Sequence, residues 1–509
     1  MFIKWFFLII FFAVMIACGF FARRKTKSIS DFVLGGRNVG PWMSAFAYGT
    51  AYFSAVVFVG YAGQFGWRYG ISASWIGIGN ALLGSLLAWV VLGRRTRIMT
   101  NHLFSATMPD FFGKRYNSKN LTLVASAIIF IFLVPYTASV YNGLSRLFEM
   151  AFGMPFMYCV IGMAALTAAY VILGGYLATA INDFIQGIIM LIGIVVIIGS
   201  VLASEGGLTE SLTKLSFVNG AAEEGIRQAG VFTSFFGPDP VGLISVIILT
   251  SLGTWGLPQM IHKFYAIKSE KAITTGTVVS TVFAVIIAGG SYFLGGFARL
   301  FDSPAIHKDG GGIIFDAIIP SMLANMSDIV IAVTIVLVLS ASMSTLASLV
   351  ITSSSTMTLD FLRRLYKKEP TEKVQLLLMR LLIVFFILVS VVFAINPPTF
   401  IAQMMGISWG ALAGAFLAPF LYGLYWKKAT KTAVWACFAF GVGLTVSNMF
   451  LHYIPSSITA GAIAIVGGLL VLDLVDKRLV TRGKRAEQKT RTRICGKYFP
   501  LLRGNRNST

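Results

Sequence analysis

The chain has 509 residues, of which 56% are hydrophobic and only 12% are charged, and its formal net charge is +21. Because a soluble globular domain carries roughly 25% charged residues, this composition excludes a protein that faces water on all sides. The basic residues fall in short loops and in the C-terminal tail rather than on one compact face. This pattern is typical of membrane topology and argues against nucleic-acid binding.

Thirteen apolar segments follow one another along the chain, each long enough to cross about 30 Å of hydrocarbon as a helix. Since backbone polar groups cannot remain unpaired in lipid, we expect an all-α polytopic membrane protein. The first segment is followed by Arg23 and Arg24 rather than by a small-residue cleavage site, so we interpret it as an uncleaved span. The segments lie near residues 3–22, 41–62, 70–92, 121–145, 155–174, 182–203, 240–258, 272–298, 327–355, 376–395, 401–425, 432–452 and 457–475.

The Lys and Arg residues predict how these segments are oriented. If the N-terminus lies outside, most of the loop cations fall on the cytoplasmic side, where short basic loops remain. The sequence therefore predicts a cell-membrane protein with an external N-terminus and a cytoplasmic C-terminus, whose basic tail 477–509 lies near anionic lipid. The opposite set of connections contains only Arg68, Arg146, Lys214, Arg227, Arg299 and Lys308.

The four cysteines and four histidines are scattered along the chain and show no metal-ligand spacing. No cluster of catalytic side chains is apparent either. We therefore expect a transporter and not a membrane enzyme.

Two of the segments contain signals for an interrupted helix. Gly49-Thr50-Ala51 lies in the middle of the second segment, where a local break would free carbonyl groups to bind a cation; the alternative is an ordinary packing face of small residues. The stretch from Gly253 to Pro258 holds two glycines and a proline, which favour a discontinuous seventh helix. Because these segments are five apart, they fit two inverted five-span repeats, 41–203 and 240–425.

Polar side chains inside the spans are the candidates for function. The ninth segment carries a run of hydroxyls that includes Ser344 and Thr345. Hydroxyl and carbonyl oxygens suit sodium, a hard cation that must also be released, although helix packing through Ser and Thr is the alternative. Asp183 opens the sixth segment near the membrane edge. It is either a helix N-terminal acid stabilised by the macrodipole or a carboxylate at the inner mouth of an ion route.

Three motifs follow one another along the chain: DFVLGGRNVGPW after the first segment, GGYLATAINDFIQG around Asp183, and SMSTLAS followed by SSSTMTLDF in the ninth segment. With these motifs the chain resembles the sodium/solute symporter family from about Asp31 to Lys431. It is most similar to the bacterial proline and pantothenate permeases of that family. The resemblance implies the leucine-transporter fold, with two inverted repeats of five helices. The predicted regions are a first helix with a cytoplasmic loop (1–40), the first repeat (41–203), an extracellular loop (204–239), the second repeat (240–425), two C-terminal helices (426–476) and the basic tail (477–509).

The resemblance also implies a sodium site between the first and eighth core helices. By position, Asp183 corresponds to the family's acidic residue near the cytoplasmic exit of that site. The implied sodium ligands are the carbonyl groups of Thr50, Phe53 and Ala341 and the hydroxyls of Ser344 and Thr345.

Two departures from the family pattern leave the solute open. Tyr52 stands where the proline permease has an aspartate, and Thr250 and Thr254 stand where it has an aromatic pair. The GLPQ stretch and Asn396-Pro397-Pro398 look more like the pantothenate branch. A small carboxylate-bearing solute fits both branches. The residues expected to line the solute pocket, each with plain packing as the alternative, are Tyr52, Tyr136, Thr254, Trp255 and Gln259.

The predicted function is sodium-coupled import of a small organic solute, such as proline, pantothenate or a monocarboxylate. We expect a monomer in the lipid bilayer that works by alternating access, with sodium as the coupling ion. A proton-coupled carrier of the same fold is less favoured because the predicted spans place no titratable residue in mid-membrane. A non-transporting solute sensor is less favoured because the tail is too short for a signalling domain.

Overall fold

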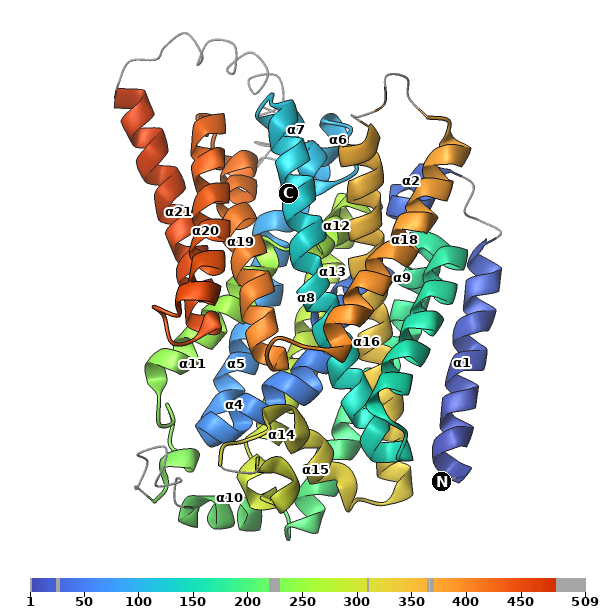
Figure 1. The fold of residues 1–509 in the computed structure, drawn as a ribbon, viewed down its shortest axis with the longest axis vertical. Coiled ribbons are helices and arrows are strands. Elements are labelled where there is room, and N and C mark those ends of the chain that lie inside the picture. Colours follow the sequence, from blue (N-terminus) through green and yellow to red (C-terminus); the bar gives the residue numbers. More distant parts are fainter. Residues whose placement is uncertain are drawn as a thin grey trace.

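The computed structural model describes residues 2–23, 28–218, 229–308, 311–363, 366 and 370–481. These residues form a bundle of helices that run mostly along one direction, and no β-strand occurs among them (Figure 1). The prediction of an all-α membrane protein is confirmed. Each of the thirteen predicted segments overlaps helical structure. Within the described ranges, nine helices are long and apolar enough to cross a membrane, or ten if the bent pair Pro240–Trp255 and Pro258–Tyr265 is one span. Thirteen crossings therefore remain a prediction.

The first half of the core contains a helix that is sharply kinked. Gly175 lies inside α9 with φ 57° and ψ −166°, a backbone conformation that is open to glycine and closed to most other residues. The kink lets one helical run cover two predicted segments. The elements of this half are α3 (Pro41–Tyr52), η2 (Val56–Tyr61), α4 (Ala62–Tyr69), η3 (Gly70–Ala73), α5 (Ser74–Gly79), η4 (Asn80–Leu87), η5 (Trp89–Gly93), α6 (Arg94–His102), α7 (Met108–Arg115), α8 (Lys119–Phe152) and α9 (Phe156–Ser204).

The second half begins after α10 (Leu208–Phe217) and contains the second interrupted helix. Its elements are α11 (Pro240–Ile247), η8 (Ile248–Leu252), η9 (Gly253–Trp255), α12 (Pro258–Tyr265), α13 (Glu270–Ala284), η10 (Val285–Gly289), α14 (Gly290–Gly295), η13 (Phe315–Ala317), α15 (Ile318–Ala324), α16 (Asp328–Thr356), η14 (Met357–Leu362), α18 (Glu372–Ile395) and α19 (Ile401–Tyr425). Outside the two halves lie α1 (Phe2–Arg23), α2 (Ile29–Leu34), α20 (Lys431–Leu451) and α21 (Ser457–Thr481).

Helix α16 occupies the middle of the bundle. It contacts α9, α8, α1, α18 and α3, whereas α1 lies at one edge and α21 at the opposite edge (Figure 1). Nearly all side chains of α16 from Val330 onward are buried. The hydroxyls of this helix therefore face other helices and not lipid, which is where polar groups in a membrane protein are expected to carry function.

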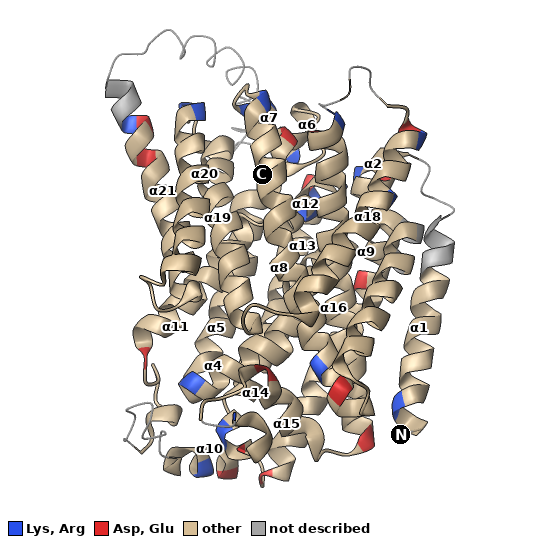
Figure 2. Ribbon diagram, in the orientation of Figure 1, with Lys and Arg blue, Asp and Glu red and all other residues tan. Residues whose placement is uncertain are grey.

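Charged side chains gather at the two ends of the bundle, with few between them (Figure 2). One end carries α6 and α7 and the other carries α10 and α15 (Figure 1). An apolar band between two charged ends is what a lipid bilayer requires of the surface that it surrounds. The predicted basic tail lies outside the described residues from position 482 onward.

Helices α4 and α14 approach one another through a pair of glycines. A Cβ atom on Gly66 would overlap the backbone of Gly295, and one on Gly295 would overlap the backbone of Ala62. We expect Gly295→Ala to destabilise the protein by about 1–3 kcal/mol, because the two backbones must separate. The unfolding temperature in detergent measures this. The control is Gly199→Ala, at a position where a Cβ meets no atom within 4 Å; equal unfolding temperatures for the two variants would show that α4 and α14 separate without cost.

Asp316 in η13 links a loop to the start of α19, where its Oδ2 accepts the backbone N–H of Ile401 at 3.2 Å. Burial raises the pKa of this carboxyl to about 6, against opposing effects of the Ile401 N–H and Arg146. Since the folded protein then binds more protons than the unfolded one, the contribution of Asp316 to stability falls as pH rises from about 4 to about 6. Asp316→Asn removes this titration. We therefore expect the variant to gain unfolding temperature relative to the wild type between pH 4.5 and pH 7; a constant difference across that range would contradict the assignment.

Candidate functional site

The break predicted in the second segment is present, but it is displaced by a few residues. Helix α3 ends at Tyr52, and Phe53 is extended before η2 begins at Val56. Gly49 remains helical, and it packs so closely against Phe283 that a Cβ would overlap the ring. Gly49 therefore serves helix packing, and its carbonyl accepts the N–H of Phe53. The end of α3 at Tyr52 leaves the carbonyl groups of Thr50 and Ala51 for partners outside the helix.

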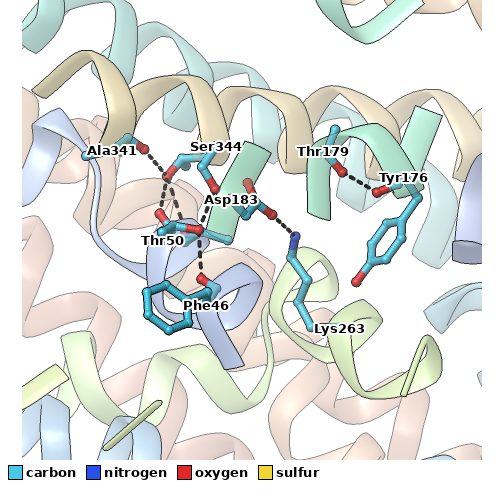
Figure 3. Close-up of polar contacts among 10 residues, drawn as sticks. Phe46, Thr50, Tyr176, Thr179, Asp183, Lys263, Ala341 and Ser344 are labelled. Atoms are coloured by element: carbon cyan, nitrogen blue, oxygen red, sulfur yellow. Dashed lines mark hydrogen bonds and ion pairs between the residues drawn. The ribbon is translucent and has the colours of Figure 1, made fainter. Parts of the chain in front are cut away.

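Two hydroxyls of α16 face this last turn. Ser344 Oγ donates a hydrogen bond to Thr50 Oγ1 at 2.8 Å (Figure 3). Thr345 Oγ1 lies 3.3 Å from the carbonyl oxygens of Thr50 and Ala51 and 3.1 Å from that of Ala341. All of these residues are buried. Neutral hydroxyl and carbonyl oxygens gathered in this way are the ligands that a hard cation prefers.

A buried ion pair lies next to this group of oxygens. Lys263 Nζ on α12 is 3.5 Å from Asp183 Oδ2 on α9, and the two side chains are 2% and 0% exposed (Figure 3). The interpretation of Asp183 as a helix N-terminal acid is wrong, because the second part of α9 starts at Gly175, about two turns earlier. Buried charges are costly unless they are paired, so the ion pair with Lys263 explains how the carboxylate of Asp183 can be fully buried.

A narrow cavity of about 10 Å³ lies between the two interrupted helices, η4, α8, α14 and α19. This volume holds roughly one water molecule, so a solute can enter only when the lining helices move apart. Among the described residues, the lining holds no charged side chain. Its main polar and aromatic members are Tyr52, Tyr61, Asn80, Tyr136, Tyr292 and Trp409.

A larger cavity of about 820 Å³ opens among α2, α7, η14 and α18. Charged side chains of both signs line it, including Asp360, which accepts a hydrogen bond from Thr107 Oγ1 at 2.5 Å. A third, very small cavity is lined by Lys263 together with Ser348 and Thr352, which follow Ser344 along α16. Polar surface thus continues from the oxygens around Thr50 toward the end of the bundle that carries α7.

Residues 32–441 match the model of the sodium:solute symporter family. The chain belongs to the sodium:solute symporter family. It is therefore a sodium-coupled solute symporter, as predicted, and sodium is the ion to which transport is coupled.

Relatives of this symporter are transporters and not enzymes. It is 28% identical over 490 residues to the osmoregulated proline transporter OpuE of Bacillus subtilis, an alignment that covers 92% of this chain and 94% of that protein. It is 29% identical over 445 residues to sodium/proline symporter 2 of Staphylococcus saprophyticus, with 84% of this chain and 82% of that protein covered.

Solved structures of other transporters share the fold of this symporter. A Na⁺-coupled sialic acid symporter in a substrate-bound outward-open state aligns with a TM-score of 0.73 at 17% identity, covering 93% of this chain and 97% of that chain. A manganese transporter from Eremococcus coleocola aligns with a TM-score of 0.55 at 12% identity, covering 89% and 99%. The predicted leucine-transporter fold is confirmed.

The structure separates the predicted solute-pocket residues of the symporter into two groups. Tyr52 and Tyr136 line the central cavity. Thr254 donates to the carbonyl oxygen of Ser251 at 2.8 Å, and the indole N–H of Trp255 donates to the carbonyl oxygen of Leu83 at 3.0 Å. Neither residue lines the central cavity. Gln259 follows the break at Leu257, where the chain bends by 41°, and it lines the small cavity beside Lys263 instead.

Several residues of the site were not identified from the sequence. Lys263 follows the predicted seventh segment and was not among the expected site residues, but it lies in α12 and is paired with Asp183. Asn80 is an amide inside an apolar segment, a signal that could have marked it, since polar side chains in spans are costly. Tyr61 and Trp409 carried no such signal, because aromatic side chains are common in membrane helices.

Proposed function

We propose that this symporter imports proline together with sodium. Two relatives are named as proline transporters. The central cavity lies beside the break that follows α3, and its aromatic and apolar lining is suited to a small solute. The single observation that supports the sodium site is that the hydroxyls of Ser344 and Thr345 lie within hydrogen-bonding distance of Thr50. On this proposal the ion is held by the carbonyl groups of Thr50, Phe53 and Ala341 and the hydroxyls of Ser344 and Thr345.

Transport proceeds by alternating access. Sodium binds from outside and ties α3 to α16, which orders the broken helix beside the solute cavity. Tyr52 and Tyr136 line the pocket in which the solute binds, and Thr254, Trp255 and Gln259 contact it only as the helices move. Sodium then leaves past Asp183, whose pairing with Lys263 holds α9 and α12 together until the inner side opens.

The proposed topology has thirteen spans, an external N-terminus and a cytoplasmic C-terminus. The end of the bundle that carries α6 and α7 is then cytoplasmic, and the end that carries α10 and α15 is external (Figure 1). The two inverted repeats run over 41–203 and 240–425, and the two interrupted helices, one in each repeat, support this division. We propose that the protein functions as a monomer in the bilayer.

One sodium ion supplies enough free energy for concentrative uptake. Moving one charge through 100 mV releases about 2.3 kcal/mol, and a tenfold sodium gradient adds about 1.4 kcal/mol. Together these terms support roughly 500-fold accumulation of a neutral or zwitterionic solute.

Uptake of labelled proline into proteoliposomes tests the proposal. We expect uptake with an inward sodium gradient, little uptake when choline replaces sodium, and no restoration by a proton gradient. Equal uptake in choline medium would overturn sodium coupling, and uptake driven by protons would favour the proton-coupled alternative. Uptake of labelled pantothenate but not of proline would show that the proposed solute is wrong, without contradicting sodium coupling. Binding without uptake would indicate a solute sensor.

A further inference from the structure

Three polar atoms in the lining of the central cavity have no hydrogen-bond partner: the hydroxyls of Tyr61 and Tyr292 and the indole Nε1 of Trp409. The three side chains are only 1%, 0% and 3% exposed. A buried donor without a partner is costly, and the great majority of such groups in folded proteins are satisfied. Three of them in the lining of one cavity point to a ligand that supplies the missing partner.

The other polar groups of this cavity are largely occupied by the protein itself. The Tyr52 hydroxyl donates to the carbonyl oxygen of Thr250 at 2.6 Å. Asn80 Oδ1 accepts from Thr250 Oγ1 at 2.8 Å and from Ser251 Oγ at 3.0 Å. Tyr292 lies near the side chain of Asn80, which is a polar neighbour within the protein. Tyr61 and Trp409 are therefore the groups most in need of an external partner.

The chemistry of these two groups selects the class of ligand. An indole N–H can only donate a hydrogen bond, and a tyrosine hydroxyl can donate one at the same time. The indole therefore requires an acceptor, and the hydroxyl, which can also accept, pairs with an acceptor when it donates. An ionised carboxylate is acceptor-only and has two oxygens, one for each of the two groups. Val56, Val57 and Met405 supply apolar surface in the same lining for an aliphatic body.

A carboxylate in this cavity also has a source of compensating positive charge. Tyr52 and Ser54, both in the lining, are the chain neighbours of Phe53, whose carbonyl group is one of the proposed sodium ligands. The cavity therefore adjoins the proposed ion. No Arg or Lys is then needed to neutralise the solute.

We propose that the indole N–H of Trp409 and the hydroxyl of Tyr61 bind the carboxylate of the transported solute and select carboxylic acids over uncharged analogues. This assignment rests on the proposed function and deepens it, since it names the group of the solute that is recognised and the two side chains that recognise it.

The test compares an acid with its amide in proteoliposomes. In the wild type, we expect unlabelled proline to inhibit labelled proline uptake at concentrations about 10–100-fold lower than prolinamide, the factor that a hydrogen bond to a charged group contributes. Tyr61→Phe keeps the ring and removes only the donor, whereas Trp409→Phe removes the donor and puts a smaller aromatic ring in place of the indole. Each is expected to raise KM for proline and to bring the inhibition constants of acid and amide together. Tyr141→Phe is the control, because the Tyr141 hydroxyl is also buried, has the side chain of Thr167 as a polar neighbour and does not line the cavity.

Sodium binding is measured separately, as the rise in unfolding temperature that sodium alone causes. The proposal is overturned if the wild type does not distinguish acid from amide, a result that needs no variant to fold. It is also overturned if the two variants retain sodium stabilisation and wild-type selectivity. Failure of the proposed function appears differently: the wild type would then show no sodium-driven proline uptake at all.

Discussion

Replacing Thr345 with alanine is expected to raise the sodium concentration for half-maximal uptake by about 10–100-fold, the loss typical even of residues that only support a metal ligand. The Thr345 hydroxyl lies within 3.3 Å of the carbonyl oxygens of Thr50 and Ala51 and 3.1 Å from that of Ala341. Its removal deletes an oxygen from the point where α3 and α16 meet. The measurement is the sodium dependence of proline uptake in proteoliposomes.

Two further variants separate ion binding from general damage to α16. Thr345→Ser keeps the hydroxyl and is expected to retain most of the sodium affinity. Thr334→Ala removes a buried hydroxyl that only donates to the carbonyl oxygen of Val330 in its own helix, so it is expected to leave sodium dependence unchanged. If Thr345→Ala showed the sodium dependence of the wild type, the proposed ion site would be in the wrong place.

Breaking the ion pair between Asp183 and Lys263 is expected to be the most destabilising of the charge substitutions. Lys263→Met leaves a carboxylate that is 0% exposed without its cation, and losing one partner of a buried pair typically costs about 3–5 kcal/mol. We therefore expect a large fall in unfolding temperature in detergent. In the double variant Asp183→Asn/Lys263→Met no charge remains, so most of the stability is expected to return while uptake stays impaired.

The exposed pair between Arg94 and Glu270 provides the comparison. Its side chains are 49% and 45% exposed, and exposed pairs contribute roughly 0–1 kcal/mol. Arg94→Met is therefore expected to change the unfolding temperature little. Equal stability of Lys263→Met and the double variant would show that Asp183 does not depend on Lys263 for its burial.

Some features of this symporter depend only on local pattern, and the sequence predicts them well. Runs of about 20 apolar residues locate helices because backbone groups in lipid must be paired within the segment. Gly256 and Pro258 predicted the interruption before α12 because glycine weakens a helix interior and proline is tolerated only in the first turn, where Pro258 lies. The hydroxyls at Ser344 and Thr345 were identifiable as candidates because polar side chains in a span are costly.

Other features were decided by contacts between residues far apart in the chain. Gly49 stays helical beside Phe283, so the break falls at Phe53 instead. The 41° bend before α12 places Gln259 away from the central cavity.

The sequence by itself determined the class of protein, its helical segments and the oxygen-rich face of α16. Only the tertiary structure decided that Lys263 pairs with Asp183 and that Tyr61 and Trp409 share one cavity. The physical reason is that hydropathy and helix propensity act within one segment, whereas the neighbour that a side chain meets depends on how separate helices rotate and pack against each other.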